Sequence, residues 1–302
     1  MNAIIHLRTI SDLCRFLNIG AANHPLIAVL DLCKLIDQYP GEVRIRTDFY
    51  TVMFKNYCRN HMRYGRKTLD FQDGNLVCIA PGQVITIDND IEMRDDMLGW
   101  GVCFHPDIIR GSAMGAAMRD YTFFGYDTAE ALHLSDKEKS TLHDIVLKLR
   151  SELHERIDDF SRRIILAHLE LLLNYTMRCY GRQFITRSPS HRDVLHRVES
   201  ILIEHIKNGS KRHNDLPTVR SLAEQVNLSP GYLSDLLKKE TGLSAQDHIH
   251  RMIIEEAKDQ LKQTERSVSE VAFSLGFEYP QYFSRLFKLK TGLSPAEYRK
   301  QD

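Results

Sequence analysis

The chain has 302 residues, of which 43% are hydrophobic and 26% charged, and its 40 Lys+Arg balance its 40 Asp+Glu. These values are those of an average globular protein and exclude a disordered chain, while the neutral balance excludes a generally basic scaffold such as a histone. The length suffices for two domains, each with a core of its own.

The sequence predicts a cytoplasmic protein without a membrane segment. No apolar run approaches the roughly 18 to 20 residues that cross a bilayer, and residues 1–10 lack the apolar stretch of a signal peptide. Six scattered cysteines without a CxxC pair are typical of small core residues in a reducing compartment. We expect neither a disulfide framework nor a zinc site.

Between about residues 27 and 104, short apolar runs alternate with turn signals. A spacing of roughly ten residues between turns, rich in β-branched and aromatic residues, is typical of an antiparallel sandwich or barrel. The dipeptides Asp73-Gly74 and Pro81-Gly82 supply the positive φ that tight turns need. The expected strands include Val43–Ile45, Phe49–Phe54, Leu76–Ala80, Val84–Ile87 and Trp100–Phe104.

Residues 135–180 change to a helical pattern and predict a hairpin of two long helices. Ser135 followed by Glu138 forms a capping box at the start of the first helix. Apolar residues recur at helical spacing in both segments, and these stripes either pack onto the sheet or form the seam of a dimer, or do both. The residues that we assign to dimerisation are Leu142, Val146, Leu149, Leu169 and Leu172.

Residues 183–192, QFITRSPSHR, are polar, lack periodicity and carry Pro189 between two serines. This composition predicts a linker between an N-terminal domain, residues 1–182, and a C-terminal domain, residues 193–302.

The C-terminal domain contains an internal repeat. Tyr232–Ser244 (YLSDLLKKETGLS) aligns without a gap with Tyr282–Ser294 (YFSRLFKLKTGLS), and eight of the thirteen positions are identical. A short helix with a small residue, Ala223 or Ala272, precedes each copy. A helix-turn-helix needs that small residue for close helix crossing.

Asn227 and Gly276 suit the left-handed turn between the two helices of each copy, and Gly242 and Gly292 suit the helix ends. Residues 244–263 predict one rigid helix between the copies, which suits insertion into successive major-groove turns about 34 Å apart. The alternative is a plain helical bundle, but two copies are too few for a solenoid.

The segment GFEYPQYFSRLFKLKTGLSPAEYRK (Gly276–Lys300) closely resembles the C-terminal signature of the AraC/XylS family of transcription regulators. Leu228–Ser244 resembles the first helix-turn-helix of that family, and the resemblance covers about residues 193–300, a third of the chain. It implies an α+β protein: an N-terminal cupin-like antiparallel β-barrel, a helical dimerisation hairpin and a DNA-binding domain with two helix-turn-helix units.

The resemblance places the recognition helices at Ser229–Lys239 and Tyr279–Leu289. Arg285 can pair bidentately with guanine and Gln281 with adenine, whereas the carboxylate of Asp235 can accept from cytosine but repels phosphates. The predicted DNA-binding residues are Gly231, Tyr232, Ser234, Asp235, Lys238, Lys239, Pro280, Gln281, Tyr282, Ser284, Arg285 and Lys288.

The N-terminal half offers no catalytic or metal-binding pattern. Six histidines precede residue 150 without the HxH or HxxxH spacing of a cupin metal centre, and a nucleophile elbow and a phosphate loop are also lacking. We therefore expect no metal, no cofactor and no enzymatic activity.

The leading hypothesis is a homodimeric regulator that binds double-stranded DNA and a small-molecule effector. The family resemblance further favours transcription activation through contact with RNA polymerase. One alternative keeps DNA binding but makes the N-terminal half only a dimerisation or protein-interaction module. A cupin-type enzyme with an accessory helical domain is the other alternative.

Overall fold

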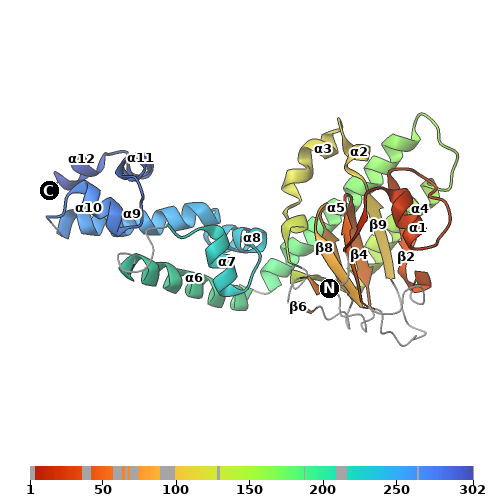
Figure 1. The fold of residues 1–302 in the computed structure, drawn as a ribbon, viewed down its shortest axis with the longest axis horizontal. Helices are drawn as coiled ribbons and strands as arrows, with labels where there is room; N and C mark the ends of the chain where they lie inside the picture. Colours follow the sequence, from red (N-terminus) through yellow and green to blue (C-terminus); the bar gives the residue numbers. More distant parts are fainter. Residues whose placement is uncertain are drawn as a thin grey trace. The chain divides into compact units, whose positions relative to one another are not determined.

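The computed structural model divides the chain into two compact units, Met1–Thr186 and Arg187–Asp302. The first unit contains β-sheets and helices, and the described residues of the second form helices, so the chain is a mixed α+β protein as predicted (Figure 1). No described helix is long and apolar enough to span a membrane. The structure describes residues 4–35, 42–56, 63–64, 67–68, 74–88, 99–127, 130–186, 188–208, 216–263 and 265–301.

The described strands of the first unit form two five-stranded sheets. The order in one sheet is β1 (Ile4–Leu7), β3 (Glu42–Thr47), β8 (Val84–Asp88), β5 (Arg63–Tyr64) and β6 (Lys67–Thr68). The order in the other is β10 (Leu132–His133), β7 (Asn75–Ile79), β4 (Tyr50–Lys55), β9 (Gly99–Phe104) and β2 (Ile27–Asp31).

The predicted apolar runs fall in strands β3, β4, β7, β8 and β9, and all described pairs are antiparallel except one. Strand β1 pairs in parallel with β3, which corrects the expectation of a purely antiparallel sheet. Its sequence, IIHL, is too short for the alternation that announces a strand. Among the described strands no pairing joins the two sheets, so a closed cupin-like barrel stays a prediction.

Gly82 has a φ of +84°, as predicted for the turn at Pro81-Gly82. The turn joins β7 to β8, which lie in different sheets, so it carries the chain from one sheet to the other instead of closing a hairpin. Gly74 also has a positive φ, and its predicted partner Asp73 lies outside the described residues.

The second sheet is covered on both faces. All residues of β7 and β9 are buried, although alternate side chains point to opposite faces. On one face Met53, Val77 and Ile79 pack together with Ile85 of the first sheet. On the other, the ring of Phe104 stacks on Tyr50, 5.1 Å away.

The short helices of the first unit lie before and after the sheet strands. They are α1 (Ile10–Phe16), η1 (Leu32–Leu35), α2 (Pro106–Ile109), α3 (Ala113–Ala117), η2 (Met118–Asp120) and η3 (Thr122–Gly125). The long helices α4 (Asp136–Glu152) and α5 (Ser161–Thr186) form the predicted hairpin, and Ser135 and Glu138 make the predicted capping box.

The hairpin packs on the second sheet. Helix α4 contacts the edge strand β2, and α5 contacts β10 at the opposite edge. The residues assigned to a dimer seam are each at most 2% exposed, because they fill the interior of this unit. They are therefore unavailable to a second copy, which corrects the assignment of Leu142, Val146, Leu149, Leu169 and Leu172.

The division between the two units falls inside the predicted linker, but the described residues of 183–192 are helical. Helix α5 reaches Thr186, and α6 covers Ser188–Asn208. Gln183 belongs to the core, where its side chain accepts from the His133 N–H (2.9 Å) and donates to the Ala131 carbonyl (3.3 Å). Pro189 occupies the first turn of α6, where a missing N–H costs no hydrogen bond.

The second unit continues with the helices that form the repeat. They are α7 (Val219–Val226), α8 (Pro230–Thr241), α9 (Ala245–Gln263), α10 (Val268–Ser274), α11 (Pro280–Thr291) and α12 (Pro295–Arg299).

Candidate nucleic-acid interface

Helices α7–α8 and α10–α11 are the two predicted helix-turn-helix units. Ala223 and Ala272 are fully buried where each first helix meets its partner. Asn227 and Gly276 adopt positive φ values of 59° and 90° in the turns. The small residue and the left-handed turn predicted for each unit are thus confirmed.

The two recognition helices, α8 and α11, begin and end alike. Each ends at the left-handed glycine that was predicted, and each has a proline at its first position. The Gly242 N–H donates to the Lys238 carbonyl (2.9 Å), and the Gly292 N–H donates to that of Lys288 (2.8 Å). Both helices therefore have defined ends and present one fixed face.

Helix α9 is the common support of the two units, as residues 244–263 predict. It contacts α8 of the first unit and α10, α11 and α12 around the second. Lys290 at the end of α11 pairs with Asp247 at the start of α9 (2.7 Å), and this hydrogen bond lowers the pKa of the Asp247 carboxyl. Arg299 donates to the Leu261 carbonyl near the other end of α9 (3.1 Å).

The second recognition helix presents a polar face opposite its buried anchors. Phe283 and Phe287 are fully buried. The exposed side comprises an amide, a phenol and two cations, with two half-buried residues beside them. The exposed residues are Gln281, Tyr282, Arg285 and Lys288, and the half-buried ones are Pro280 and Ser284.

Tyr279 joins this face and was missed in the sequence-based list of sites. It is 50% exposed, and its ring contacts that of Tyr282 at 5.8 Å in an edge-to-face arrangement. As the residue preceding α11, it offered a signal, because residues at the start of a recognition helix contact base edges.

The first recognition helix presents a less polar face. Lys238 and Lys239 are exposed, whereas Gly231, Ser234 and Asp235 are half-buried. The Ser234 hydroxyl donates to the Pro230 carbonyl (2.8 Å). The cations of α8 therefore lie towards its end.

Tyr232 does not belong to the exposed surface, and its assignment as a DNA-binding residue is wrong. Its side chain is 4% exposed. The hydroxyl lies 3.2 Å from Nε2 of His191, a buried residue of α6, and the two rings meet edge to face at 6.1 Å. Helix α6 thus covers the tyrosine that opens the repeat.

The described residues contain no group of three His, Cys, Asp or Glu side chains arranged to hold a metal ion. Burial raises the pKa of the Cys103 and Cys179 thiols to about 12, as expected for cysteines that act as core residues.

Residues 222–301 match a family described as a helix-turn-helix domain. The chain is 34% identical over 140 residues to the uncharacterized HTH-type transcriptional regulator YijO of Escherichia coli (strain K12), covering 46% of this chain and 45% of that protein. It is 38% identical over 81 residues to the arabinose operon regulatory protein of the same organism, covering 27% of this chain and 28% of that protein. The chain thus spans less than half of the length of these relatives.

Among solved structures, the C-terminal domain of the two-component response regulator yesN from Fusobacterium nucleatum subsp. nucleatum shares 32% identity with this chain. The superposition covers 36% of this chain and 99% of that one, with a TM-score of 0.32.

Proposed function

Since the chain belongs to the AraC/XylS family of transcription regulators through its C-terminal domain, we propose that the whole protein is a sequence-specific regulator controlled by a small-molecule effector. Double-stranded DNA is the partner of the second unit, and the first unit takes the effector. The observation that carries this proposal is the pair of recognition helices fixed to the single helix α9.

We assign direct base recognition to the second helix-turn-helix unit. The exposed guanidinium of Arg285 and amide of Gln281 match the two bidentate pairings that proteins use in the major groove, with guanine and with adenine. Lys238 and Lys239 of the first helix-turn-helix unit match phosphate contacts, which position the protein without specifying sequence.

We propose a homodimer that uses the outer side of α5 in place of its buried stripe. Ile164 and Leu171, seven residues apart and hence on one side of the helix, are 38% and 42% exposed. A dimer on a two-site operator gains affinity through effective concentration. An Ile164→Glu, Leu171→Glu double variant should sediment as a monomer, with Lys148→Glu on α4 as the control.

The remaining parts of the proposal rest on the family. We infer a cytoplasmic, non-enzymatic protein that activates transcription by contacting RNA polymerase. The named relatives above are regulators. The alternative is an N-terminal unit that serves only for dimerisation or protein contact. An effector-dependent change in DNA affinity distinguishes an effector-binding unit from this alternative.

Genome-wide mapping of binding sites, followed by titration of the full chain on a mapped site and on a shuffled duplex, tests the proposal. We expect discrete sites and a mapped-to-shuffled affinity ratio of at least about 10³, as for specific DNA-binding proteins. Equal affinity for both duplexes across salt concentrations would refute sequence-specific regulation.

A further inference from the structure

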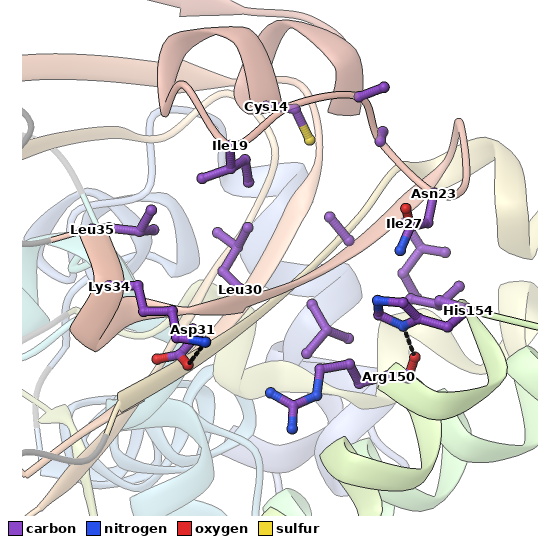
Figure 2. Close-up of a pocket in the computed structure, with 15 residues that line it drawn as sticks. Cys14, Ile19, Asn23, Ile27, Leu30, Asp31, Lys34, Leu35, Arg150 and His154 are labelled. Atoms are coloured by element: carbon purple, nitrogen blue, oxygen red, sulfur yellow. Dashed lines mark hydrogen bonds and ion pairs between the residues drawn. The ribbon is translucent and has the colours of Figure 1, made fainter.

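A cavity of about 540 Å³ lies in the first unit at the free edge of strand β2 (Figure 2). Residues from both faces of β2 line it, and α1, the segment 19–23, η1 and the end of α4 complete its walls. Such a volume is in the range of small-molecule sites. Ile19 is 40% exposed beside it, an apolar surface that a ligand would cover.

The strand contributes backbone groups as well as side chains. Among the described strands β2 is the last of its sheet. The His105 N–H donates to the Leu26 carbonyl (2.8 Å), so residue 26 occupies a hydrogen-bonded position of the ladder, although its own N–H donates to Nδ1 of His24 (3.1 Å). Because such positions alternate along an antiparallel ladder, Ile27, Val29 and Asp31 turn their N–H and C=O groups to the open edge.

The cavity is lined by two basic side chains, Lys34 and Arg150, but by a single carboxylate, that of Asp31. Lys34 is 3.4 Å from the Asp31 carboxylate, so these two charges offset one another. Among the described residues no carboxylate pairs with the Arg150 guanidinium at the end of α4, which Figure 2 shows on the same side as His154. A guanidinium beside an apolar wall suits a carboxylate, which it can bind through two parallel hydrogen bonds.

His154 adds a polar group of defined orientation. Its Nδ1 lies 2.7 Å from the Arg150 carbonyl oxygen. A carbonyl only accepts, so Nδ1 carries the hydrogen, and in the neutral ring Nε2 is an acceptor. The site thus combines a cation, an acceptor, strand-edge backbone groups and an apolar wall.

We infer that this cavity binds a small organic carboxylate with an apolar body. Its carboxylate pairs with Arg150, and its apolar part covers Ile19 and Leu35. The inference rests on the proposed effector function and gives the effector a site and a chemical class. A ligand held by Arg150 acts on α4, which packs on α5, the last helix of the first unit.

Calorimetric titration of the full chain with phenylacetate and hexanoate tests the inference, with phenylacetamide and hexanamide as neutral counterparts. We expect the carboxylates to bind at least about tenfold more tightly than the amides, and Arg150→Gln to abolish that preference. Lys148→Gln, the same change of charge on the exposed side of α4, should leave binding unchanged. Ala21→Trp, which fills the cavity from an exposed position, should block binding.

Several outcomes overturn the inference: no binding of either carboxylate, equal binding of acids and amides, or full binding by Arg150→Gln. The DNA affinity of the same variants separates this result from the proposed function. Arg150-dependent binding without any change in DNA affinity retains the site and refutes the effector role. An effect on DNA affinity that survives Arg150→Gln and Ala21→Trp retains the effector role and refutes the site.

Discussion

The two helix-turn-helix units differ most at the tyrosine that opens the repeated segment. Tyr232 of the first unit is 4% exposed, whereas Tyr282 of the second is 64% exposed. Both stand at the same place in helices with the same proline start and glycine end. The repeat therefore specifies the helix, and the surroundings decide whether its tyrosine is core or surface.

Helix α6 is the source of this difference. It contacts α7, α8 and α9 and supplies His191 to Tyr232 and Glu199 to the vicinity of His248. The equivalent of His248, fifty residues on, is Tyr298, whose ring contacts Phe287 at 5.4 Å. The first helix-turn-helix unit is thus packed as part of a larger core, and the second helix-turn-helix unit presents more of its recognition helix.

Replacement of each tyrosine by alanine should give the largest difference between the two helix-turn-helix units. Tyr232→Ala removes a buried aromatic side chain and its contact with His191, so we expect a loss of about 3 to 5 kcal/mol in the free energy of unfolding of the C-terminal unit, Arg187–Asp302. Tyr282→Ala should stay within about 0.5 kcal/mol of the parent. Hydrogen exchange of α8 amides measures both losses. Fluorescence of the single tryptophan does not, because Trp100 lies in the N-terminal unit, Met1–Thr186. Similar losses in both variants would contradict the contrast.

Arg285→Ala should weaken binding to a mapped DNA site by about 1 to 3 kcal/mol and relax the preference at one base pair. The matched control is Asp235→Ala at the same place in the first repeat. It should bind as tightly as the parent or more tightly, because it removes a charge that repels phosphates. Titration over a set of single-base variants checks both, and an unchanged base preference in Arg285→Ala would refute our reading face.

Acidification should destabilise the first helix-turn-helix unit before the second. Burial lowers the pKa of His248, Arg251 lowers it further, and Glu199 opposes both. The folded state then holds fewer protons than the unfolded state, so stability declines as the pH falls below the ordinary value of 6.5 towards the lowered pKa. Hydrogen exchange at neutral and mildly acidic pH measures this, and His248→Gln should flatten the dependence. An unaltered slope in that variant would assign the effect to other groups, such as His250.

Replacement of a lysine in the first helix-turn-helix unit should produce the smallest change in DNA binding. Lys238→Ala should weaken binding about equally on all duplexes and reduce the salt slope of the binding constant by about one. A loss confined to the mapped site would show instead that the first unit contributes to base recognition.

Local features were predictable because neighbours in sequence determine them. The capping box at Ser135, the turns at Asn227 and Gly276 and the helix ends at Gly242 and Gly292 each follow from a few adjacent residues. The exposed polar face of α11 was predictable too, since helical periodicity separates it from Phe283 and Phe287.

Features that depend on distant partners were missed. Residues 183–192 are polar, yet Gln183 finds its partners fifty positions earlier, at Ala131 and His133, and so continues a helix. The short strand β1 is stabilised by parallel pairing with β3, some forty residues on. Neither relation leaves a periodic signal in the sequence.

The sequence by itself determined the doubled helix-turn-helix, because the repeat, its small residues and its glycines are requirements of backbone geometry. Only the tertiary structure decided how the two copies differ. Burial of a side chain depends on which other element covers it, and helix α6 covers Tyr232 but leaves Tyr282 exposed. The same packing placed the apolar stripes of α4 and α5 against the sheet and left the outer side of α5 exposed.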